Sequence, residues 1–173
     1  MSFKNSRYHN SVQRVRKFIY EDIQKTLDLS NSPKGAPNFL LALVLCCYTE
    51  YWGKLLLENP KESSSKKAFE AFFKRLGQDY QTLVNNAAID IYRDIRCGLA
   101  HAYLIEGRDA AINIGKGSSG VVYDPKLNKY TFYVSTYFED FKNAVDAYIS
   151  GLESGAENLS NLENALKAKP ELI

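Results

Sequence analysis

A chain of 173 residues with 45% hydrophobic and 24% charged residues has the composition of one soluble globular domain, residues 1–173. That composition excludes a disordered tail, a collagen-like chain and a bare coiled coil. The 22 Lys and Arg residues against 20 Asp and Glu leave a net charge of +2, so any nucleic-acid site would be a local patch and not a global field.

The cysteines and the apolar runs indicate in which cellular compartment the protein lies. Cys46, Cys47 and Cys97 are odd in number and form no Cys-x-x-Cys, which argues against both a disulfide framework and a zinc site. The longest apolar run, 39–48, has 10 residues and is too short to span a bilayer, and the polar N-terminus has no signal-peptide hydrophobic region. We therefore expect a cytoplasmic protein with no membrane contact, metal or cofactor.

The first half of the chain predicts helices. Apolar residues recur every three or four positions over 12–27, with Asn10 or Ser11 as the cap, and a second helix over about 38–58 is apolar nearly all round at its start. Ser65 is the predicted cap of a shorter third helix that ends before Gly77. One continuous fourth helix then follows, from about residue 80 to 98.

The second half predicts a small β-insertion over about 110–134. Residues 111–114, 121–123 and 130–134 alternate or are rich in β-branched and aromatic residues, which predicts an antiparallel hairpin or meander. Thr136 and Glu139 form a capping box for the last long helix, and Ser154 and Glu157 form another that opens a terminal helix over about 155–168. The expected fold is mainly α, a four- to five-helix up-and-down bundle with this insertion before its last long helix.

Arg96, His101 and Tyr103 lie together where the fourth helix runs out. A guanidinium can bind two phosphate oxygens and offset the charge that develops during phosphoryl transfer, and a histidine can take or give a proton near neutral pH. On RNA, a base near the 2′-hydroxyl lets that oxygen attack the adjacent phosphate without a metal. Because the other histidine, His9, lies in the N-terminal segment, a two-fold homodimer would supply the second acid–base group.

Residues 92–103, Tyr-Arg-Asp-Ile-Arg-Cys-Gly-Leu-Ala-His-Ala-Tyr, resemble the signature of the HEPN superfamily (higher eukaryotes and prokaryotes nucleotide-binding domains). That signature is Arg-x4-6-His late in a four- or five-helix bundle, and a toxin branch extends it to Arg-x4-His-x-Tyr. Cys97 stands where the family commonly has a polar residue, and the predicted strands are not part of the minimal bundle. The strands favour a distinct branch.

The resemblance implies a function. Many HEPN proteins are metal-independent endoribonucleases with a composite site in a homodimer cleft, so Arg96 and His101 would be the catalytic pair. In the toxin branch, a nucleotidyltransferase-type antitoxin modifies the motif tyrosine with AMP, which would make Tyr103 a regulatory residue. The resemblance alone implies a toxin–antitoxin or phage-defence setting. The alternative is a non-catalytic HEPN module that binds a nucleotide or a partner protein.

Glu50 and Arg93 are auxiliary candidates. Glu50 lies in an otherwise apolar helix, and a buried carboxylate needs a partner, which Arg93 or Arg96 could supply. A structural pair is favoured over a catalytic role, and an Arg96–Glu50 pair is also compatible with a plain dimeric scaffold. Asp94 and Arg93 are predicted to form a solvated face, with Arg93 a candidate phosphate contact.

Residues 115–120 spell Gly-x-Gly-x-x-Gly. A dinucleotide fingerprint has to open a helix, but a strand is predicted next, and the chain lacks the other kinase motifs. We interpret the segment as a flexible hairpin loop whose amides and Lys116 are a secondary candidate for phosphate contact.

Overall fold

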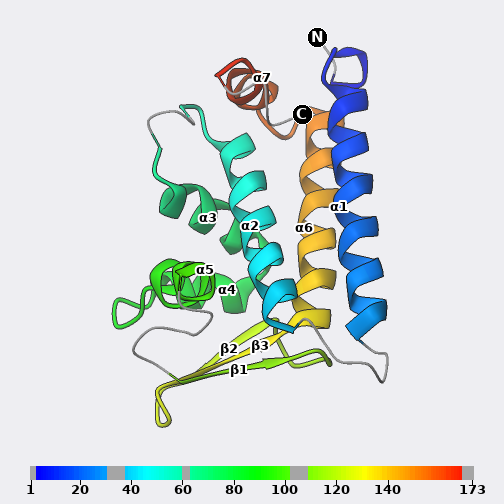
Figure 1. Ribbon diagram of the computed structural model, residues 1–173. Helices are drawn as coiled ribbons and strands as arrows, with labels where there is room; N and C mark the ends of the chain where they lie inside the picture. Colours follow the sequence, from blue (N-terminus) through cyan, green and yellow to red (C-terminus); the bar gives the residue numbers. More distant parts are fainter. Residues whose placement is uncertain (1–2, 31–37, 60–62, 102–108, 169–173) are drawn as a thin grey trace.

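The computed structural model describes residues 3–30, 38–59, 63–101 and 109–168. Its long helices α1 (His9–Ser30), α2 (Asn38–Leu56) and α6 (Val134–Ser154) run side by side, as Figure 1 shows. The 3₁₀ turn η1 (Phe3–Asn5) precedes α1, and α7 (Leu159–Ala168) packs on α2 at the end of the bundle opposite the sheet. The predicted mainly helical bundle with a small β-insertion is confirmed.

Short helices cover one side of α2. They are α3 (Ser65–Phe73), the 3₁₀ turn η2 (Lys74–Leu76), α4 (Gln78–Asn85), the π-helix η3 (Tyr92–Cys97) and α5 (Gly98–His101). The prediction of one continuous fourth helix is wrong, because the chain leaves the helix after Asn85 and resumes it only at Ile91. The break lets the second part turn away from α4 and lie between α2 and the sheet.

The sheet contains β1 (Asp109–Asn113), β2 (Val121–Asp124) and β3 (Lys129–Tyr133) in the order β1-β3-β2. β2 and β3 form the expected antiparallel hairpin, but β1 pairs with β3 in parallel, so an all-antiparallel meander is wrong. Parallel pairing requires the chain to cross over β3 before β2 begins. It does so at Gly117, where an added Cβ would lie 2.4 Å from the Tyr133 ring.

Several predicted caps act differently. Ser64, and not Ser65, caps α3, since its side chain accepts from the Lys67 amide. α6 begins at Val134, so Thr136 lies inside the first turn and its hydroxyl accepts from the Gly117 amide at 2.9 Å. α6 also continues through Ser154.

The core is rich in aromatic side chains and lies between α2, α3, α6 and the inner face of the sheet. α2 and α3 approach most closely at Gly53, where an added Cβ would lie 1.8 Å from the Ala68 carbonyl oxygen. This contact brings the start of α3 beside the polar part of α2. Among the described residues, α2 is the one helix long and apolar enough to cross a membrane, and half of it is buried, as is typical of a core helix.

Candidate functional site

The candidate site centres on the short segment η3–α5. Arg96 lies in η3, and His101 is the last residue of α5. The side chain of His101, and Tyr103 as a whole, lie outside the part of the chain that the structure describes. The motif segment is therefore helical from Arg96 to His101, but its first part is a π-helix, a rare geometry that is frequently found at functional sites.

Glu50 on α2 holds Arg96. The Arg96 Nε donates to Glu50 Oε2 at 2.9 Å, and Lys54 Nζ donates to Glu50 Oε1 at 2.7 Å. The Glu50 side chain is only 6% exposed, whereas those of Arg96 and Lys54 are each 22% exposed. One buried carboxylate thus anchors two partly exposed cations, and the pairing expected for Glu50 is made with Arg96.

Electrostatics keep this cluster charged. Burial alone would raise the pKa of Glu50, but hydrogen bonds from Lys54 and Ser65, together with the nearby cations, hold it below its ordinary value. Burial disfavours the charged form of Arg96, but the Glu50 carboxylate outweighs it and raises the pKa of Arg96 further. The cluster of Glu50, Arg96 and Lys54 therefore carries a net positive charge at neutral pH.

The two terminal Nη groups of Arg96 are not used in its contact with Glu50. Among the described residues, Glu50 contacts the guanidinium only at Nε, and the Tyr92 ring lies 5.9 Å from the guanidinium carbon. An arginine fixed in this way is preorganised to bind phosphate oxygens through both Nη groups. The half-buried thiols Cys47 and Cys97 lie in the same region; burial raises the pKa of Cys47, while the charge of Arg96 lowers it.

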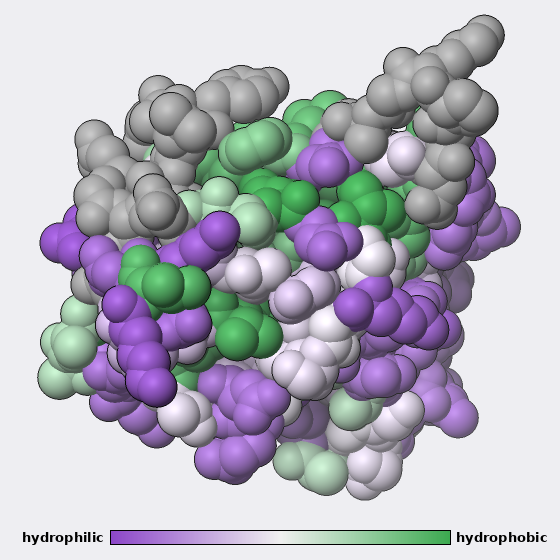
Figure 2. All heavy atoms as spheres, turned by 90° about the horizontal axis from the view of Figure 1, so that it is seen from below, coloured by the Kyte–Doolittle hydropathy of each residue, from purple (hydrophilic) through white to green (hydrophobic). Residues whose placement is uncertain are grey.

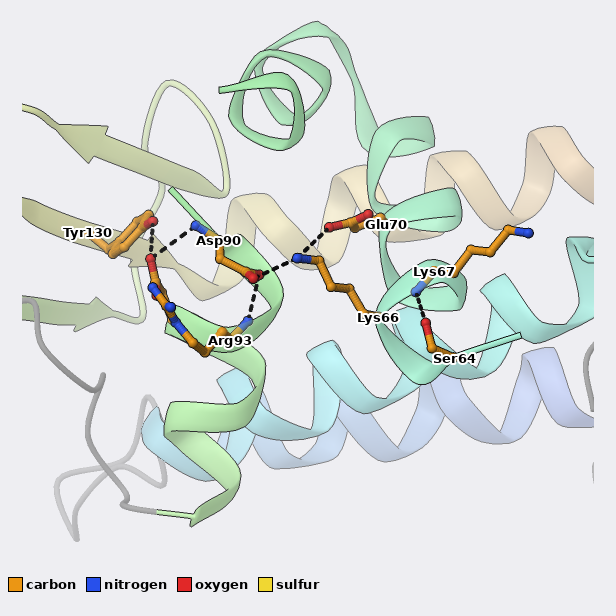
Figure 3. Close-up of polar contacts among 8 residues, drawn as sticks. Ser64, Lys66, Lys67, Glu70, Asp90, Arg93 and Tyr130 are labelled. Atoms are coloured by element: carbon orange, nitrogen blue, oxygen red, sulfur yellow. Dashed lines mark hydrogen bonds and ion pairs between the residues drawn. The ribbon is translucent and has the colours of Figure 1, made fainter. Parts of the chain in front are cut away.

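Asp94 is buried, so the prediction that it forms a solvated face is wrong. It is 1% exposed, because it points toward the sheet, where the Tyr130 hydroxyl donates to its Oδ2 at 3.0 Å. Arg93 is on the surface as expected, with a side chain 66% exposed, but its guanidinium donates to Asp94 Oδ1. Figure 3 shows these contacts beside the ion pair of Asp90 with Lys66 from α3.

The Gly-rich segment connects β1 to β2, which do not pair with each other, so the hairpin-loop interpretation is wrong. The amide of Gly115 donates to Asn113 Oδ1, that of Gly117 to Thr136 and that of Gly120 to the Tyr80 hydroxyl. These three amides each donate to a side chain of the protein, that of Gly115 at the surface and that of Gly120 in the interior. They do not form an anion-binding cradle.

The described residues contain no group of three or more His, Cys, Asp or Glu side chains placed to hold a metal ion. Sequence reasoning missed Lys54, Tyr130 and the π-helix. The position of Lys54 four residues after Glu50 was an available signal, because residues at this spacing are neighbours on a helix. Tyr130 had no local signal.

Comparisons with known proteins give no relative. A scan against protein-family models, a search of curated proteins and a search of solved structures each found no match to this chain. The functional argument consequently depends on the residues of the site.

Proposed function

We propose that the protein is a metal-independent endoribonuclease of the HEPN type, with Arg96 and His101 as the catalytic pair. The observation that carries the proposal is the setting of Arg96. It is held at Nε by a buried carboxylate and remains partly exposed, on a π-helix that leads directly to His101. An arginine with only a structural role does not need this unusual backbone geometry beside a histidine.

The reaction follows from these groups. His101 removes the proton from a ribose 2′-hydroxyl, O2′ attacks the adjacent phosphorus, and the bond from phosphorus to the 5′-oxygen breaks. Arg96 stabilises the charge that develops on the phosphate oxygens. The leaving 5′-oxygen takes a proton from a second acid, and the products carry a 2′,3′-cyclic phosphate and a 5′-hydroxyl.

The second acid comes from another copy of the chain. His9 begins α1 at the end of the bundle opposite the sheet, whereas α5 lies at the sheet end, so the two histidines of one chain do not share a site. Figure 2 shows apolar surface on the face that carries the sheet, and Leu29, Phe39 and Leu40 are large exposed apolar residues at the end of α1 and the start of α2. A homodimer through this end would cover such residues and bring two motifs together.

The biological setting in this proposal comes from the resemblance. The protein would act in the cytoplasm as a toxin or a defence effector. A nucleotidyltransferase-type antitoxin would modify Tyr103 and silence the enzyme. Glu50 and Arg93 are auxiliary residues in this scheme, since they hold the motif or contact RNA near it.

RNA cleavage in EDTA tests the function. We expect wild type to cleave RNA and leave 2′,3′-cyclic phosphate ends, and His101→Ala to lose at least about 100-fold in rate, because general acid–base catalysis contributes 10²–10⁴-fold. His9→Ala is the matched control and keeps full activity, since the His9 ring contacts Phe3, Asn10 and Glu153 and no described residue of the motif segment. Retained cleavage by a folded His101→Ala protein would refute the proposal.

A non-catalytic module that binds a nucleotide or a partner protein is the second candidate. Cys97 in the motif and the low net charge of +2 favour it. If neither wild type nor His101→Ala cleaves RNA, but a nucleotide binds to wild type and not to Arg96→Gln, the binding module is the correct function.

A further inference from the structure

We propose that Tyr130 and Asp94 are positioning residues through which the β-sheet holds the π-helical turn that presents Arg96. The catalytic part of this inference rests on the proposed ribonuclease function; its structural part does not. Tyr130 lies on the central strand β3, between β1 and β2, and Asp94 lies inside η3. The insertion that follows the motif in sequence would thus return to hold the motif in space.

The contact is specific and buried. Tyr130 is fully buried and its hydroxyl donates to Asp94 Oδ2, while the other carboxylate oxygen accepts from Arg93 Nε and Nη2 at 3.1 and 3.0 Å. The Asp90 amide also points to Oδ2, at 3.4 Å. Each oxygen of Asp94 therefore has a donor, one from the sheet and one from its own turn (Figure 3).

Stability alone is a weak reason for a carboxylate at this position. Asp94 is 1% exposed. Burying an ion costs free energy that its ion pairs repay only in part, and apolar pairs at such sites are often as stable or more so. A buried Tyr–Asp hydrogen bond fixes the orientation of the two side chains relative to each other, which an apolar pair does not.

The direction matters because the turn faces two neighbours. Asp94 meets Tyr130 of the sheet, and Arg96, two residues later, meets Glu50 of α2. Residues two apart on a helix point to nearly opposite sides, so these contacts hold η3 from both sides. If the sheet side is released, the turn is free to relax toward an ordinary α-helix, which changes the direction of every side chain after it, Arg96 included.

Tyr130→Phe tests the inference, because it removes one hydroxyl and keeps the ring. Tyr20→Phe is the matched control: it also removes a Tyr–Asp hydrogen bond, to Asp146 at 2.8 Å, but between α1 and α6. Far-UV circular dichroism and fluorescence of the single tryptophan, Trp52, report that each variant is folded.

Two readouts are measured on both variants. The first is RNA cleavage, where we expect Tyr130→Phe to lower kcat by about 10- to 100-fold with KM unchanged, as for a misplaced catalytic group. The second is the rate of iodoacetamide labelling, resolved by peptide mass spectrometry. Labelling of the half-buried Cys97 in the turn should rise about tenfold, since one hydrogen bond to a charged group is lost, while Cys46, which is buried, stays protected.

The outcomes separate this inference from the proposed function. If wild type cleaves RNA, an unchanged kcat in Tyr130→Phe, or an equal fall in Tyr20→Phe, overturns the inference and leaves the function standing. If wild type does not cleave RNA, the function fails and Cys97 labelling decides. Faster labelling in Tyr130→Phe alone supports the sheet contact, and equal rates in wild type and both variants overturn it.

Discussion

Replacing Glu50 with glutamine removes the charge that holds Arg96 and Lys54 and keeps the shape of the side chain. Removing one partner of a fully buried ion pair costs about 3–5 kcal/mol. Here the cost is smaller, because both cations are 22% exposed and can be partly hydrated, and because glutamine keeps one oxygen as an acceptor. We expect Glu50→Gln to lower the free energy of unfolding by about 2 kcal/mol at pH 7, the value of a hydrogen bond to a charged group.

The pH dependence has a defined sign. The folded protein holds the pKa of Glu50 below its ordinary value, so the carboxylate stabilises the fold above the unfolded-state pKa of about 4.3, and this stability is lost as the pH falls through the lower folded-state pKa. The difference between wild type and Glu50→Gln should therefore be constant near neutral pH and shrink below about pH 4. Urea unfolding at several pH values measures it, with Trp52 fluorescence as the signal.

Glu139→Gln is the control for this experiment. Glu139 pairs with Lys142 at 2.8 Å, but its side chain is 54% exposed, so we expect a loss below about 0.5 kcal/mol. Two results would refute the reasoning: Glu50→Gln as stable as Glu139→Gln at pH 7, or a stability difference that persists unchanged in acid.

Two further predictions concern contacts that place the site. Gly53→Ala puts a methyl group 1.8 Å from the Ala68 carbonyl oxygen, so α2 and α3 have to separate, and the melting temperature should fall by about 6–12 °C for a loss near 3 kcal/mol. Tyr80→Phe removes the hydroxyl that donates to Asp140 and accepts from the Gly120 amide, which should cost about 1–3 kcal/mol and speed hydrogen exchange at Gly120.

Each of these has a result that contradicts it. Gly155 caps α6 at a φ of 81° with open space around it, so Gly155→Ala carries only a backbone cost of about 1–2 kcal/mol. If Gly53→Ala melts at the same temperature as Gly155→Ala, the close approach of α2 and α3 is wrong. If Gly120 exchanges at the wild-type rate in Tyr80→Phe, the loop is held by other contacts.

Local patterns predicted the elements better than their connections. The apolar period of α1 and the β-branched residues of β2 and β3 are properties of a few neighbouring residues, and the structure places these elements close to the expected bounds. The parallel pairing of β1 depends on residues far apart in the chain. The break after Asn85 had a local signal that the periodicity argument overlooked, since the Asn86 side chain accepts from the Ala88 amide. A capping-box sequence likewise allows a helix to begin at that point but does not require it. The Thr136 hydroxyl accepts from the Gly117 amide instead, because that loop lies against it.

The candidate site also has some features that local sequence patterns predict and others that depend on the tertiary structure. Arg96, His101 and Tyr103 were identified from spacing within one segment, and Glu50 from the cost of burying a carboxylate. The choice of Arg96 over Arg93 as its partner needed the tertiary structure, because the π-helical turn decides which side chain faces α2. Asp94 was assigned to the wrong environment, since its partner Tyr130 lies on a strand 36 residues later.

Short-range patterns in the sequence were enough to predict the helical character of this protein and the position of its insertion, and to select the candidate site residues. These follow from periodicity, propensity and side-chain type, which act over a few residues. Only the tertiary structure decided which of those residues meet. Burial and ion pairing depend on contacts between distant segments, and the Glu50–Arg96 and Asp94–Tyr130 contacts exist only because α2 and the sheet enclose the same short turn.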